Sequence, residues 1–256
     1  MFMFRVALIG PDGCGKTTIA RRLESSLTVP AKYVYMGVSL ESSNLVLPTT
    51  WLLLRWKKLR GRRPDMAGPP DPTRKPRPPR GLLRRAAAKL KAALRLSNLV
   101  GEEWFRQRVI SHYRRRGRVV LSDRDFFADY YAHDVAPPPA AEPSVNGSAR
   151  PLSSRIHGYL LRRFYRRPDL AIFLDAPAEL LYLRKAEGTV KLLERRRQEY
   201  LRLREVLPNF QTVDAARPLD EVAAEVRERI LEFYRLREQA APLSRRAKPQ
   251  VISWEI

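Results

Sequence analysis

The stretch that decides the fold is Gly10-Pro-Asp-Gly-Cys-Gly-Lys-Thr17, which matches the complete pattern G-x-x-x-x-G-K-[ST]. The residues before it, Phe4 to Ile9, are apolar and predict a short strand. The residues after it, Thr17 to Leu27, predict a helix. A strand, a glycine-rich loop and a helix in this order are the context in which the pattern binds phosphate.

The chemistry of this loop predicts a nucleoside triphosphate site. Its glycines allow a tight turn that points backbone N–H groups inward, toward phosphate oxygens at the positive end of the helix. We expect Lys16 to reach the β- and γ-phosphates and the hydroxyl of Thr17 to hold Mg²⁺, so ATP and Mg²⁺ are the predicted ligands. The residues expected to bind the nucleotide are Gly10, Asp12, Gly13, Cys14, Gly15, Lys16, Thr17 and Thr18.

Length and composition bound the class of protein. The 256 residues suit one α/β domain with insertions. The sequence has no apolar run of about 18 residues, so we expect no membrane-spanning helix. Met1 to Ile9 is too short for a signal peptide. Cys14 is the single cysteine, which excludes an intrachain disulfide, and we expect a cytoplasmic protein.

The net charge of +22 is concentrated in one segment. Between Trp51 and Val100 there are fifteen Lys or Arg and only two Asp. Such a basic stretch favours a polyanionic partner, either nucleic acid or an anionic membrane surface. The tryptophans and leucines of 51–56 beside basic residues suit a membrane interface. The alternative is a helix that packs on the core by its apolar side and leaves its charges in solvent.

Strand and helix signals alternate along the rest of the chain. Strands are predicted at 4–9, 32–36, 119–121, 170–174 and 210–213, with helices between them. This alternation predicts an α/β fold of the P-loop NTPase kind, with a parallel sheet of about five strands and helices on both faces. Gly61 to Arg80 contains seven prolines, so 38–100 is predicted to be a basic, proline-rich insertion. Within it, 81–96 reads as a helix, and 102–116 as a separate helix of the core.

A second group of polar residues is predicted where the parallel strands end. Asp123 and Arg124 follow Val-Val-Leu-Ser, and Asp175 and Asp214 follow the next two strands. Carboxyl ends of parallel strands border the ligand crevice. Asp123 is expected to order Mg²⁺ or orient an acceptor hydroxyl, and Arg124 to hold an acceptor phosphate. We expect Asp175 and Asp214 to be turn or cap residues.

These motifs, taken in order, resemble the thymidylate kinase family of P-loop nucleoside monophosphate kinases. The resemblance rests on the phosphate loop, Leu121-Ser-Asp-Arg, Arg167-Pro-Asp-Leu-Ala-Ile-Phe-Leu-Asp-Ala and Val213-Asp-Ala, and it covers about 4–37 and 100–235. It implies a kinase-like domain at 1–241, interrupted by the insertion and followed by a tail at 242–256. It also implies a Mg²⁺–ATP donor and a mobile basic lid near 184–197.

The resemblance further assigns roles to single residues. The phosphate loop has no arginine, so the lid is expected to supply the catalytic cation. The residues expected to act in catalysis are Lys16, Asp123, Arg124, Arg184 and Arg195, with Thr17 and Asp123 at the metal. The loop Val213-Asp-Ala-Ala is expected to lie near the adenine.

The acceptor is the least determined part of the prediction. Tyr35-Met-Gly-Val-Ser39 replaces the Arg-Glu-Pro-Gly stretch that contacts the acceptor in the family. We therefore expect an ATP-dependent phosphotransferase that acts on dTMP, the family default, or on another small acceptor, nucleotide or sugar-like. A homodimer is left open. The alternative from another class is an NTP-binding module whose segment 51–100 grips nucleic acid or an anionic membrane.

Overall fold

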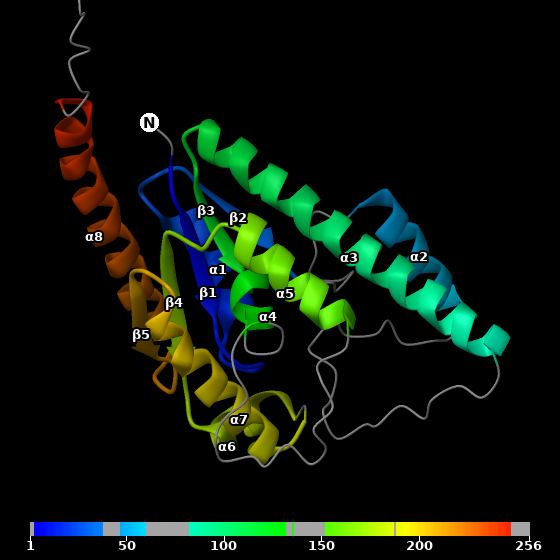
Figure 1. Ribbon diagram of the computed structural model, residues 1–256. Helices are drawn as coiled ribbons and strands as arrows, with labels where there is room; N and C mark the ends of the chain where they lie inside the picture. The colour runs from blue at the N-terminus through cyan, green and yellow to red at the C-terminus, as the bar shows by residue number, and fades with distance from the viewer. Residues whose placement is uncertain are drawn as a thin grey trace, which may run out of the picture.

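The computed structural model describes residues 3–37, 47–59, 82–131, 135, 152–186 and 188–246. Its centre is a sheet of five parallel strands in the order β2-β3-β1-β4-β5 (Figure 1). The strands are β1 (Arg5–Ile9), β2 (Ala31–Tyr35), β3 (Val119–Asp123), β4 (Leu170–Asp175) and β5 (Phe210–Asp214). The predicted fold class, a parallel α/β sheet with helices on both faces, is confirmed.

Helices connect the strands in the manner of crossover units. They are α1 (Lys16–Ser26), α2 (Pro48–Leu59), α3 (Leu82–Arg115), α4 (Phe126–Tyr130), α5 (Leu152–Phe164), α6 (Ala178–Lys185), α7 (Val190–Leu201) and α8 (Leu219–Arg246), with the 3₁₀ turn η2 (Arg202–Glu205) after α7. Among the described residues, no helix is long and apolar enough to cross a membrane.

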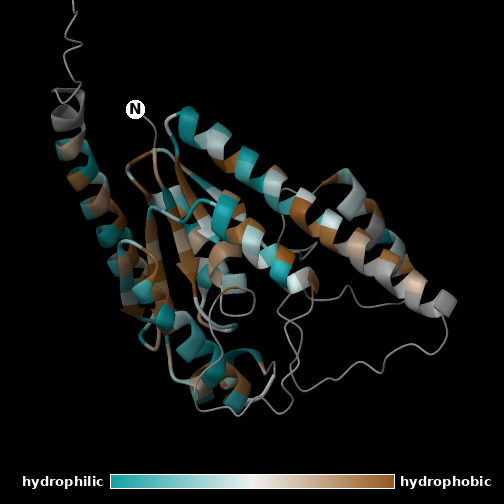
Figure 2. Ribbon diagram, in the orientation of Figure 1, coloured by the Kyte–Doolittle hydropathy of each residue, from teal (hydrophilic) through white to brown (hydrophobic). Residues whose placement is uncertain are grey.

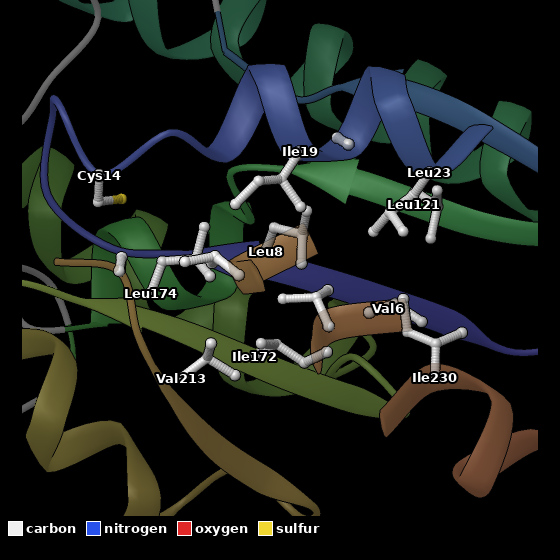
Figure 3. Close-up of a cluster of buried hydrophobic side chains, with 14 of the residues drawn as sticks. Val6, Leu8, Cys14, Ile19, Leu23, Leu121, Ile172, Leu174, Val213 and Ile230 are labelled. Carbon is white, nitrogen blue, oxygen red and sulfur yellow. The ribbon is translucent and has the colours of Figure 1, made fainter. Parts of the chain in front are cut away.

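The two faces of the sheet are buried against different helices. Successive side chains of a strand point to opposite faces. On β1, Val6 and Leu8 therefore join the larger core, which α1 and α8 cover, as Figure 3 shows with Ile19 and Ile230. Ile9 points the other way and packs with residues around α4, α7 and η2. Burial on both faces explains why these strands read as continuous apolar runs.

Helix α3 corrects two boundaries of the sequence analysis. The predicted helices at 81–96 and 102–116 form one helix of 34 residues, so the predicted end of the insertion at 100 falls inside it. Gly101 alone costs a helix only about 1 kcal/mol, too little to end it. Directly after the glycine, Arg106 pairs with Glu102 at 2.8 Å, which supports the next turn of the helix.

The C-terminal boundary also differs from the expectation. Helix α8 continues to Arg246, past the expected start of the tail at 242. The proline-rich stretches 60–81 and 136–151 lie outside the described residues, as do 38–46 and 247–256.

Candidate functional site

The phosphate loop joins the end of β1 to the first turn of α1. Gly13 has φ +92°, and a Cβ at this position would lie 2.8 Å from the carbonyl oxygen of Leu181. Only glycine meets both conditions without strain. Gly15 caps α1 in the left-handed conformation, so the N-terminus of the helix opens onto the loop. This geometry presents backbone N–H groups and the positive helix end to an anion.

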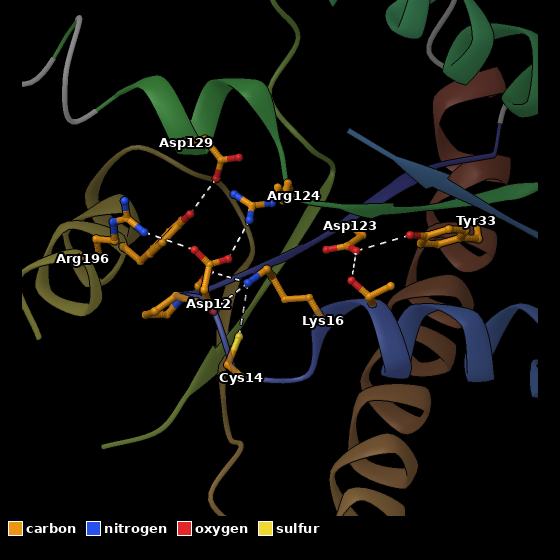
Figure 4. Close-up of polar contacts among 12 residues, drawn as sticks. Asp12, Cys14, Lys16, Tyr33, Asp123, Arg124, Asp129 and Arg196 are labelled. Atoms are coloured by element: carbon orange, nitrogen blue, oxygen red, sulfur yellow. Dashed lines mark hydrogen bonds and ion pairs between the residues drawn. The ribbon is translucent and has the colours of Figure 1, made fainter. Parts of the chain in front are cut away.

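The side chain of Lys16 points into the phosphate loop and contacts its backbone (Figure 4). Its Nζ donates hydrogen bonds of 2.7 Å to the carbonyl oxygens of Gly10 and Pro11, and lies 3.6 Å from Cys14 Sγ. The side chain is only 7% exposed. Burial raises the pKa of the Cys14 thiol, so Cys14 is a small buried filler beside the ammonium group. Lys16 is thus fixed where a phosphate oxygen would compete for its protons.

Thr17 and Asp123, the two residues predicted to hold the metal, are hydrogen-bonded to each other. The Thr17 hydroxyl donates a hydrogen bond to Asp123 Oδ2, and the Tyr33 hydroxyl donates to the same oxygen at 3.3 Å. Asp123 is 1% exposed, and its Oδ1 has no hydrogen-bond partner among the described residues. A buried carboxylate oxygen without a partner is costly unless a cation completes it. Hydroxyl and carboxylate oxygens are hard ligands that suit Mg²⁺, so the residues fit the metal.

Asp12 joins the phosphate loop to two cations. Arg124 Nη2 lies 2.6 Å from Asp12 Oδ1, and Arg196 Nη1 lies 3.2 Å from Oδ2. Burial alone would raise the pKa of Asp12, but the neighbouring cations, led by Arg124 and Lys16, lower it to about 2. Arg124 has φ 68°, a left-handed turn that directs the chain from the end of β3 toward α4. The ion pairs therefore hold the loop, the β3 end and α7 together.

A partly buried acid lies beside Arg124. Asp129 of α4 accepts a 2.7 Å hydrogen bond at Oδ1 from the hydroxyl of Tyr200 on α7 (Figure 4). Burial raises the pKa of Asp129 to about 6, against the attraction of Arg124 and the hydrogen bond from Tyr200. Sequence reasoning missed both residues. A useful signal would have been the lone acid of the otherwise apolar and aromatic stretch 126–131.

The basic residues of the expected lid point to different partners. Arg184 donates a 2.7 Å hydrogen bond to the carbonyl oxygen of Ala215, in the loop expected to face the adenine. Arg195 pairs with Glu199 of its own helix at 3.1 Å. Arg197 binds Asp175 at 2.5 and 2.9 Å. Arg196 reaches the phosphate loop through Asp12, and the roles assigned to Arg184 and Arg195 stay predictions.

The structure also places three other residues that the sequence analysis named. Gly10 is buried at the mouth of the loop, whereas Thr18 is exposed on the first turn of α1. Asp214 accepts a hydrogen bond from Ala216 N at 2.9 Å, which is the turn role expected from the sequence.

Comparisons with known proteins agree with this architecture. A model of the AAA domain (dynein-related subfamily) matches residues 5–52, which hold β1, the phosphate loop, α1 and β2. Among solved structures, the chain is similar to thymidylate kinase from Candida albicans, with a TM-score of 0.55 and 19% identity. That match covers 91% of this chain and 93% of the other. The chain therefore has a P-loop NTPase-like fold with the arrangement of a thymidylate kinase.

Proposed function

We propose that the protein is a Mg²⁺- and ATP-dependent phosphotransferase acting on a small acceptor. One observation carries this proposal: side chains from three separate elements converge at the mouth of one phosphate loop. Lys16 comes from α1, Asp123 and Arg124 from the end of β3, and Arg196 from α7. An ATPase needs the groups that bind ATP and the metal, such as Lys16 and Asp123. A kinase also needs groups that bind the acceptor, which is the role we give to Arg124.

The residues have distinct roles in phosphoryl transfer. Lys16 neutralises the β- and γ-phosphates from within the loop, and Thr17 and Asp123 hold the metal. Bound Mg²⁺ neutralises charge on the phosphates and fixes their orientation. Arg196 supplies the lid cation once a nucleotide competes with Asp12 for its guanidinium. Phosphoryl transfer depends mainly on such positioning and charge neutralisation, because little covalent chemistry is left to the protein.

The residues near the expected acceptor site are consistent with a kinase but do not identify its substrate. The likeness to thymidylate kinase makes dTMP the first acceptor to test. The end of β2, however, carries Tyr35, Met36 and Gly37, and the Gly37 carbonyl oxygen accepts a 2.5 Å hydrogen bond from buried Arg106. Arg106 is also paired with Glu102 at 2.8 Å, so this arginine is committed to holding α3 against the strand end.

The test measures ATP binding and transfer separately. Calorimetry with and without Mg²⁺ should give tighter ATP binding with the metal. Transfer from γ-labelled ATP is then followed with dTMP, other nucleoside monophosphates, nucleosides and sugars. Thr17→Ala should weaken the metal dependence, whereas Lys32→Ala, on β2 and paired with Glu24 at 2.8 Å, is the matched control. Wild-type protein that binds no Mg²⁺–ATP contradicts the proposal.

A second candidate function is favoured by the surface of α2. Beyond its first turn, the exposed side chains that the structure describes on α2 are Trp51, Leu52, Arg55, Trp56 and Leu59. At 100° per residue they fall within an arc of about 140°. Thr50 lies outside that arc and donates a hydrogen bond of 2.9 Å to Glu102 of α3, so the arc faces away from α3. Figure 2 shows brown, hydrophobic ribbon on this helix.

The charge of the same region supports an anionic partner, and its exposed apolar side chains favour a membrane surface. Segments 47–59 and 82–100 together contain eight Lys or Arg and no Asp or Glu. Exposed tryptophans and leucines beside basic residues suit the boundary between lipid headgroups and acyl chains. The four apolar side chains of the arc are between 45% and 79% exposed. A helix that only packed on the core would bury them.

Co-sedimentation with vesicles tests this second function. Binding is expected to vesicles of phosphatidylcholine with phosphatidylglycerol, and not to phosphatidylcholine alone. Trp51→Ala with Trp56→Ala should reduce it about tenfold or more. Trp104→Ala is the matched control, since Trp104 is 60% exposed on α3, outside this face. Equal binding by the double variant, or retention on single-stranded RNA but not on vesicles, contradicts the membrane function.

A further inference from the structure

The partly buried pair of Asp129 and Tyr200 is not used by the donor chemistry described above. Asp129 lies on α4, six residues after β3 ends at Asp123, and Tyr200 reaches it from α7. Helix α4 and helix α7 therefore meet at this acid, and Arg124, which pairs with Asp12 of the phosphate loop, interacts with it electrostatically. Since the hydrogen bond from Tyr200 is made to Oδ1, the second oxygen, Oδ2, lies outside that bond.

The charges around Arg124 are unfavourable for an acceptor that is itself a phosphate. Its guanidinium is 2.6 Å from Asp12. Burial acts against its charge, but the carboxylates of Asp12 and Asp129 raise its pKa. An acceptor phosphate dianion at Arg124 would have to displace Asp12 and remain close to the carboxylate of Asp129. A neutral acceptor meets no such repulsion.

A phosphate acceptor and an alcohol acceptor also differ in whether they need a base nearby. A phosphate acceptor already carries an anionic oxygen at neutral pH and needs no base. An alcohol must lose a proton as it attacks, and a positioned carboxylate can accept that proton. We propose that the acceptor of this kinase is an alcohol, and that Asp129, held by Tyr200, is the base that receives its proton. This inference rests on the proposed phosphotransferase function.

The step balances as follows. The acceptor oxygen forms a bond to the γ-phosphorus, while the bond from that phosphorus to the β,γ-bridging oxygen breaks and ADP leaves. The proton of the acceptor hydroxyl passes to Asp129 Oδ2. The charged and titratable groups that face Asp129 are Arg124 from β3, Tyr200 from α7, Lys16 from the phosphate loop and Asp125 at the cap of α4. Burial raises the pKa of Asp129 to about 6, so it is ionised at neutral pH yet still basic enough to accept a proton.

The experiment uses matched acceptors and water as probes on the full chain. Thymidine and glucose are compared with dTMP and glucose 6-phosphate, and basal Mg²⁺–ATP hydrolysis reports on water, the simplest hydroxyl acceptor. Wild-type hydrolysis should rise with pH and reach half its plateau near pH 6. Asp129→Asn should lower it on the order of 10²-fold, within the range of general-base catalysis, without changing ATP affinity.

A positioning role for Tyr200 has its own readout. A hydroxyl that donates to a carboxylate favours the ionised form. Tyr200→Phe should therefore move the half-maximal pH upward, whereas Tyr234→Phe, on α8 and bonded only to Glu238 among the described contacts, should leave it unchanged.

Three outcomes overturn the inference. The first is that Asp129→Asn hydrolyses ATP at a rate within about threefold of wild type. The second is that the phosphate group of dTMP or of glucose 6-phosphate is itself phosphorylated. The third is that the wild-type protein binds ATP but transfers phosphate to no hydroxyl, water included. Failure to bind Mg²⁺–ATP at all would instead overturn the proposed function.

Discussion

Replacing Asp129 by Asn should make the protein more stable at neutral pH while removing its activity. The carboxylate is partly buried between α4 and α7, where the loss of water costs more than Arg124 and Tyr200 return, and this raises its pKa to about 6. Asn has nearly the shape of the protonated acid and can still accept the hydrogen bond from Tyr200. The variant therefore removes the cost of burying the charge and keeps the packing.

The size and the pH range of the effect follow from linkage. The ordinary pKa is 3.8 and the folded value is about 6. A group whose pKa is raised on folding stabilises the fold fully below its unfolded pKa, and that contribution is lost as pH rises through the folded pKa. At about 1.4 kcal/mol per pKa unit, the loss is about 3 kcal/mol above pH 6. Asp129→Asn should be more stable than wild type by about this amount at pH 7.5, and by about half of it at pH 5.

Urea unfolding at pH 5 and pH 7.5 measures the difference. With a slope of about 3 kcal/mol per M for a chain of this size, the midpoint of the variant should rise by about 1 M at pH 7.5. Asp220→Asn is the control, because Asp220 is exposed at the start of α8 and should change stability by less than about 1 kcal/mol. Identical midpoints for Asp129→Asn and wild type at pH 7.5 would refute the reasoning.

Further predictions concern the phosphate loop and its cations. Lys16→Ala should keep the fold but lower turnover on the order of 10²–10³-fold, measured by steady-state kinetics, and unchanged turnover would contradict the site. Asp12, whose pKa is lowered from 3.8 to about 2, should stabilise the fold by about 2 kcal/mol above pH 4 and lose this as pH falls toward 2. Urea midpoints of Asp12→Asn that fall with acid as steeply as those of wild type would show otherwise. Arg196→Ala should lower turnover at least tenfold and Arg195→Ala less than threefold, and the reverse order would restore Arg195 as the lid cation.

The phosphate loop could be predicted from the sequence because every part of it is local. Eight consecutive residues carry the glycines, the lysine and the threonine, and the strand and helix on either side are defined by their own apolar patterns. The class of the sheet followed for the same reason, since the alternation of strands and helices leaves few topologies. The pair Thr17 and Asp123 could also be predicted from the sequence. Thr17 belongs to the phosphate-loop motif, and Asp123 stands at the end of a predicted parallel strand.

The boundaries of α3 and α8 needed the tertiary structure. Local signals such as Gly101 and Pro242 suggest ends, but α3 continues through Gly101 and α8 through Pro242. In α3, the cost of about 1 kcal/mol for one glycine is small beside the tertiary packing that stabilises a long helix.

The partners of the site cations were decided by tertiary structure alone. Arg195, Arg196 and Arg197 are equivalent in the sequence, yet they contact Glu199, Asp12 and Asp175. Successive residues of a helix point about 100° apart, so the rotation of α7 about its axis selects which arginine faces the phosphate loop. That rotation is set by how α7 packs against the sheet and against α4, where Tyr200 meets Asp129 across 71 residues of sequence. The sequence determines that a cation is present near this loop, and the packing of the helix determines which one it is.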